Sequence, residues 1–99
     1  SEAYLYQQGL SSVYAAESGA NVALGRLKTG AMGRQSFTLS VNGRRVKVTV
    51  TDTSASRTEG VILSTASDAD GGYKRTVRIT YTSEEHEGQR IITVTNVSS

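Results

Sequence analysis

The chain has 99 residues with a net charge of +2, and 36% of them are hydrophobic, which is enough for one small domain with a modest core. It contains neither cysteine nor proline, which excludes a disulfide framework and a thiolate zinc site. No stretch approaches the ~20 consecutive apolar residues of a membrane span. We therefore expect a single domain over residues 1–99.

The charge is distributed unevenly along the chain. Residues 26–78 contain ten basic and four acidic side chains, a net of +6, whereas the first 25 and the last 21 residues are each −2. A basic middle can attract an anionic partner. The alternative is that these side chains are solvated on one face of a sheet.

Residues 1–29 are predicted to form one long helix. Arg26 and Lys28 suit the negative C-terminal end of a helix dipole, and Gly30 follows where a left-handed cap belongs. Residues 30–34 then read as a short linker. The apolar residues that recur at steps of three and four along this helix are Ala3, Tyr6, Leu10, Val13, Ala20, Leu24 and Leu27.

This predicted helix is longer than the domain that it must cover. About 28 residues at 1.5 Å each give ~42 Å, so the first half is expected to project. Gly9, Gly19 and Gly25 each cost about 1 kcal/mol relative to alanine. Such residues suit the close approach of another backbone, so we expect the helix to pack on its own sheet and also on partner helices. The residues predicted at the partner interface are Tyr4, Leu5, Tyr6 and Gly9.

From residue 35 to residue 97 the period becomes two, which predicts an antiparallel meander of four or five strands. Asn42-Gly43 predicts a two-residue type I′ hairpin turn, with Val41 opposite Arg44 and Leu39 opposite Val46. A polar loop is expected between Thr51 and Glu59. Later strands are expected over residues 60–66, 73–82 and 89–97, with SDADGG and SEEHEG as turns.

The predicted fold class is therefore α+β, with one long N-terminal helix packed on the meander. The helix is expected to bury five residues, Val13, Ala16, Ala20, Leu24 and Leu27. Their expected partners on the sheet are Phe37, Leu39, Val46, Val48, Val77, Ile79 and Tyr81.

The helix sequence YAAESGANVALGRL resembles the minor pilins of type IV pili and related pseudopili, above all the PilX-type subunits. The positions that match the family's helix pattern are Ala16, Glu17, Ser18, Gly19, Ala23, Leu24 and Leu27. In the sheet half, VTVTDT followed by ILSTASDADGGYKRTVRITYT is similar to the family's strand pattern. The order and size of the parts resemble the competence-pilus minor pilins of Gram-positive bacteria.

The resemblance implies a structural subunit that initiates pilus assembly or belongs to the tip complex, and that supports DNA uptake in competence systems. It implies other minor and major pilins as partners and a location on the cell surface, with anchoring in the cytoplasmic membrane before assembly. Family members begin with a cleaved leader and an apolar helix of ~20 residues. We therefore expect Ser1 to lie mid-helix, with membrane contact only through a segment absent here.

His86 is a weak candidate for a metal ligand. It lies beside Glu84, Glu85 and Glu87, but neighbouring residues on one turn do not converge on an ion, and the chain has no second histidine. A solvated hairpin loop is expected.

Asp68 and Asp70 resemble the opening of a calcium loop, yet its twelfth position is Ile79, where a bidentate glutamate is needed. Some members of the wider pilin family bind calcium, so the question stays open, with a plain turn expected. We predict no metal site and no cofactor.

Enzyme activity is not expected. The chain contains no nucleophile elbow, and neither GANVALGR nor GAMGRQ has the spacing of a phosphate-binding loop.

The alternative function is a small non-enzymatic binding module that binds DNA or carbohydrate weakly through the outer sheet face. Phe37 and Tyr81 are expected to point inward, which leaves Tyr73 as the best exposed aromatic for stacking. Binding would be non-specific and steeply salt-dependent. The candidate DNA contacts are Arg44, Arg45, Lys47 and Arg78.

Overall fold

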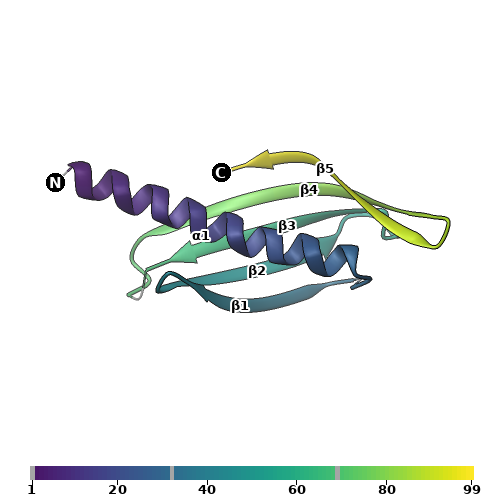
Figure 1. The fold of residues 1–99 in the computed structure, drawn as a ribbon, viewed down its shortest axis with the longest axis horizontal. Helices are drawn as coiled ribbons and strands as arrows, with labels where there is room; N and C mark the ends of the chain where they lie inside the picture. The colour runs from purple at the N-terminus through teal and green to yellow at the C-terminus, as the bar shows by residue number, and fades with distance from the viewer. Residues whose placement is uncertain (1, 32, 69) are drawn as a thin grey trace.

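The structure, a computed structural model, describes residues 2–31, 33–68 and 70–99, and the side chains of residue 3 and of those from residue 11 onward. Its elements in chain order are α1 (Glu2–Lys28), β1 (Gln35–Val41), β2 (Arg44–Asp52), β3 (Glu59–Ser67), β4 (Lys74–His86) and β5 (Gln89–Ser98). The helix lies across one face of the sheet (Figure 1). The α+β class predicted from the sequence is confirmed.

The sheet is an open meander of five strands. Its spatial order is β1-β2-β3-β4-β5, and each strand is antiparallel to the next. The molecule is elongated, with principal extents of 53 × 21 × 20 Å.

The β1–β2 hairpin forms as its turn residues predict. Asn42 has a φ of 50° and Gly43 a φ of 78°, the two positive values that a type I′ turn requires. Val41 pairs with Arg44 and Leu39 with Val46, so the predicted register is confirmed. The valines of β2 consequently share one face.

The β4–β5 hairpin turns later than expected. β4 continues to His86, which pairs with Gln89, because Glu87 and Gly88 form the two-residue turn with φ values of 52° and 82°. The expectation that His86 lies in a loop is therefore wrong, although its side chain is exposed. Glu-Gly is a poorer type I′ signal than Asn-Gly, which is why the polar run before it read as a turn.

The C-terminal end of α1 is capped as predicted. Gly30 has a φ of 105°, and its N–H donates to the carbonyl of Leu27 at 3.1 Å. The N–H of Ala31 donates to the carbonyl of Arg26 at 3.0 Å, which completes a Schellman motif.

The core lies between α1 and the three central strands. Among the side chains that the structure describes, α1 packs on the sheet over the 18 residues 11–28, so helix packing is shown over that length alone. The sheet residues in this core are Val46, Val48, Val50, Ile62, Ala66, Val77, Ile79 and Tyr81. The helix residues are Ala15, Ala16, Ala20, Ala23 and Leu27.

The buried stripe of α1 consists mainly of small residues, which corrects the sequence-based prediction. Val13 and Leu24 are half-buried at its flank, and Val22 is 40% exposed. A Cβ atom built on Gly19 would lie 2.5 Å from Ser64 Oγ and 2.6 Å from Val46 Cγ1. The close approach that Gly19 permits is therefore between α1 and its own sheet.

Candidate functional site

The sheet face that points away from α1, which we call the outer face, is mainly polar. Its side chains are the alternate residues of each strand, set in rows by the strand register. The first row is Ser40, Arg45, Ser67 and Lys74. The second row is Thr38, Lys47, Thr65 and Thr76. The third row is Ser36, Thr49, Leu63, Arg78 and Ser98.

Four exposed cations lie in these rows and form the outer cluster: Arg45, Lys47, Lys74 and Arg78. Neighbouring strands are ~4.8 Å apart and successive rows ~6.7 Å, so neighbouring charges are separated by about 7 to 12 Å at the backbone. The three rows contain no carboxylate. The register brings Lys74 into the cluster, a position that the sequence analysis did not assign to it.

Arg44 does not belong to this cluster. It lies on the helix side of β2, is 7% exposed, and its Nε donates to Ser11 Oγ at 3.1 Å. Its prediction as a DNA contact is wrong, because the alternation that sends Arg45 outward sends Arg44 under α1. The hairpin register already implied this, since Arg44 is opposite Val41.

The β3–β4 turn uses its first aspartate for structure. Asp68 Oδ1 accepts a hydrogen bond from the N–H of Gly72 at 2.7 Å, and the N–H of Gly71 donates to the carbonyl of Asp68 at 3.0 Å. This is the local side-chain bond that favours aspartate in turns. Within the described ranges, no three acidic or histidine side chains gather as a metal site would need.

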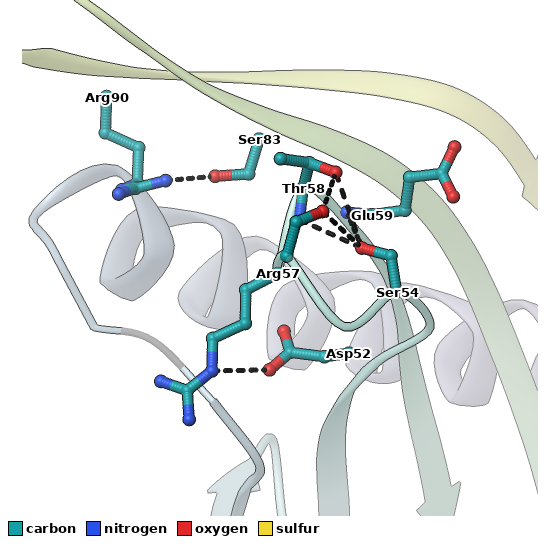
Figure 2. A network of polar contacts seen from close by, with 8 residues as sticks. Asp52, Ser54, Arg57, Thr58, Glu59, Ser83 and Arg90 are labelled. Atoms are coloured by element: carbon teal, nitrogen blue, oxygen red, sulfur yellow. Dashed lines mark hydrogen bonds and ion pairs between the residues drawn. The ribbon is translucent and has the colours of Figure 1, made fainter.

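The loop between β2 and β3 is held by its own hydroxyl groups (Figure 2). Ser54 Oγ accepts from the N–H of Thr58 at 3.0 Å and from that of Glu59 at 3.2 Å. The N–H of Ser83 on β4 donates to the carbonyl of Thr58 at 2.8 Å, which ties the loop to the sheet. The polar loop expected from the sequence is therefore an ordered turn.

Two arginines flank this loop, and each has a partner in Figure 2. Arg57, at a φ of 60°, places Nε 3.6 Å from Asp52 Oδ2. Arg90 Nη1 donates to Ser83 Oγ at 2.6 Å. Neither arginine lies in the three rows described above, so neither belongs to the outer cluster.

Tyr81 is a buried titratable group on the helix side of the sheet. Its ring lies over Gly60, the residue opposite it on β3, where a Cβ atom would collide with the ring. Burial raises the pKa of Tyr81 above its usual value of about 10, and the nearby charge of Asp52 raises it further. The group therefore stays neutral over the physiological range.

The predicted partner interface, Tyr4, Leu5, Tyr6 and Gly9, lies outside the residues whose side chains the structure describes. Over the described residues, α1 lacks the apolar run that a membrane-crossing helix needs. Comparison of the chain with protein-family models, with curated proteins and with solved structures finds no match.

Proposed function

We propose that this chain is the globular part of a minor pilin, a structural subunit that joins a type IV or competence pilus through α1. The observation that carries the proposal is the arrangement of the two layers. One N-terminal helix lies on an antiparallel meander, and its first turns extend past the β3–β4 turn (Figure 1). On this proposal, those first turns would pack against a neighbouring helix.

The packing of α1 determines where that neighbour would bind. The small residues of its second half contact the domain's own sheet, so they are not available to partners. The partner surface therefore falls on the first turns, with Tyr4, Leu5, Tyr6 and Gly9 as its residues. In this role the subunit starts assembly or belongs to the tip complex, at the cell surface, after anchoring in the cytoplasmic membrane through a preceding segment.

Reading the gene upstream of the Ser1 codon tests this proposal directly. The expected result is a basic leader ending in glycine, followed by ~20 apolar residues with an early glutamate. A different soluble domain joined directly to Ser1 would overturn the proposal.

Introduced cysteines test the partner surface, since the natural chain has none. In native cells, Tyr6→Cys is expected to be shielded from a thiol reagent in assembled filaments. Thr38→Cys, on the exposed outer side of β1, is the control and is expected to react freely. Equal labelling of the two positions in filaments would contradict burial of α1 between subunits.

A second candidate function, weak binding of DNA through the outer face, is favoured by the outer cluster. Its four cations lie in three adjacent rows without a carboxylate, which suits the spaced charges of a phosphate backbone. Replacing Arg45, Lys47 and Arg78 with glutamine should weaken binding at low salt and reduce the slope of log K against log salt by about 3.

The matched control removes the same charge elsewhere, at the exposed residues Lys28, Arg34 and Arg75. If DNA binds through the outer cluster, the control triple keeps most of its affinity and its salt slope. Equal losses in the two triple variants would show an effect of net charge, and the outer cluster would then have no special role.

A further inference from the structure

We infer that β5 pairs with β5 of a second copy of this chain, so that the two sheets join into one antiparallel sheet. β5 is the last strand in the sheet order, with β4 as its one neighbour there. The backbone groups along its other side are therefore available for strand pairing. This contact is separate from α1 and goes beyond the proposed pilin role.

The hairpin shows which backbone groups of β5 point outward. In a two-residue type I′ hairpin the residues that flank the turn, here His86 and Gln89, exchange both backbone hydrogen bonds. Since the pattern alternates, Ile91 and Thr93 also bond to β4. The N–H and C=O groups of Arg90, Ile92 and Val94 consequently point away from the sheet.

β5 carries little of the usual protection of an edge strand: Arg90, beside the turn, is its one charged residue, and its bulge lies towards the other end. Residues 91–99 contain no charged residue and no proline. Ile91 is 48% exposed, Val94 41% and Val97 57%. The bulge of β5, opposite Thr80 and Tyr81 of β4, lies near Thr95. Residues 89–94 therefore keep the regular strand geometry. This stretch is long enough for a short ladder.

The opposite edge of the sheet is better protected. β1 also lacks charge, but the guanidinium of Arg26 lies 3.8 Å from the centre of the Phe37 ring. The apolar residues of β1 on that side are half-buried and packed against the core. A strand added at β1 would cover less apolar surface than one added at β5, which selects β5 as the interface.

A second copy fits this edge because β5 is complementary to itself. Antiparallel pairing centred on Ile92 places Arg90 opposite Val94 of the other copy, and Ile91 opposite Thr93. Each outward-pointing residue then meets an outward-pointing residue, which the ladder requires. No like charges meet directly, and both helices lie on the same side of a ten-stranded sheet, as a two-fold axis demands.

Sedimentation equilibrium over a wide concentration range tests the pairing. The unmodified chain should show a monomer–dimer equilibrium, and Thr93→Lys should raise its dissociation constant at least tenfold by placing two cations near the axis. Ser36→Lys makes a comparable change on the outer side of β1 and should leave the dimer intact. Circular dichroism melts establish that both variants fold.

The register has its own test. In the variant carrying Ile91→Cys and Thr93→Cys, oxidation should join residue 91 of one copy to residue 93 of the other, because a non-hydrogen-bonded pair brings the two side chains close. A monomer at every concentration, or a dimer that Thr93→Lys does not weaken, would overturn the inference. So would disulfides that join other pairs.

Discussion

Gly19 faces β2 and β3 at a separation that leaves no room for a Cβ atom. Gly19→Ala should lower the free energy of unfolding by about 1 to 2 kcal/mol, because overpacking against rigid valines exceeds the gain in helix propensity. Gly25 is the matched control, since nothing lies within 4 Å of its added Cβ. Gly25→Ala should raise the free energy of unfolding by up to about 1 kcal/mol. Urea denaturation measures both changes.

The source of the cost at Gly19 can be located by a second substitution. Ser64 Oγ is the atom nearest to the added Cβ, and it is buried without a hydrogen bond among the described residues. Ser64→Ala should therefore recover part of the stability that Gly19→Ala loses, with a coupling energy of about 0.5 kcal/mol or more. If the two changes in unfolding free energy were strictly additive, the strain in Gly19→Ala would not come from contact with Ser64.

Tyr81 gives the fold a dependence on alkaline pH. Its pKa is higher in the folded protein than in the unfolded chain, so the folded state holds the proton more tightly. The contribution of this group to stability is complete below pH 10 and is lost as the pH rises from 10 through the folded pKa. Tyr81→Phe should lessen the fall in melting temperature above pH 10, measured against the unmodified chain. Parallel pH profiles of the two proteins would contradict this assignment.

At the scale of elements, strand pairing was easier to predict than helix packing. The hairpin residues Asn42-Gly43 determine a turn type and hence a register, so one dipeptide predicts many contacts. The buried side of α1 depends instead on how closely the sheet approaches. Helical periodicity predicts that large residues such as Val13 and Leu24 are buried. The sheet approaches so closely, however, that the buried positions are occupied by small residues such as Ala16, Gly19 and Ala23.

The same reasoning separates the predictable part of the candidate site from the rest. Because side chains alternate along β2, the sequence alone predicts that Arg45 and Lys47 share the outer face. The same alternation puts Arg44 on the helix side of the sheet. Lys74 joins them through the pairing of Ser67 with Lys74, which depends on the length of the β3–β4 turn. That length follows from the bonds of Asp68 in the turn, which composition does not reveal.

Substitutions at the flank and at the centre of the helix interface should lower the free energy of unfolding by different amounts. Leu27 is 4% exposed and lies in the core, whereas Leu24 is half-buried and packs against its border. Leu27→Ala should reduce the free energy of unfolding by about 2 to 5 kcal/mol, and Leu24→Ala by less, because part of its side chain already contacts water. Thermal melts of the two variants check the order, and a larger loss at Leu24 would reverse the assignment of centre and flank.

At the scale of the whole molecule, the meander makes most strand contacts local in sequence. Two-residue turns join β1 to β2 and β4 to β5, and the loops between β2 and β3 and between β3 and β4 are short. Closing short loops costs little entropy, and local pairing folds quickly. The contacts of α1 with β3 and β4 instead join parts of the chain that are far apart in sequence.

This difference predicts the order of folding. The hairpins should form in the transition state, and α1 should dock after it. Gly19→Ala should then accelerate unfolding and leave the refolding rate nearly unchanged, while Gly43→Ala, at a φ of 78°, should slow refolding. Stopped-flow measurements in urea give both rates. A slower refolding of Gly19→Ala would place helix docking before the barrier.

A sheet that forms before its helix docks exposes the apolar side chains of β2, β3 and β4 for a time. During that interval the exposed side chains can contact another apolar surface instead of α1, including the same face of another nascent chain. The chain's tendency to aggregate should therefore depend on how quickly α1 arrives. A helix interface made mainly of alanine, serine and glycine gives the docked state its close fit, but it offers little apolar area to speed docking.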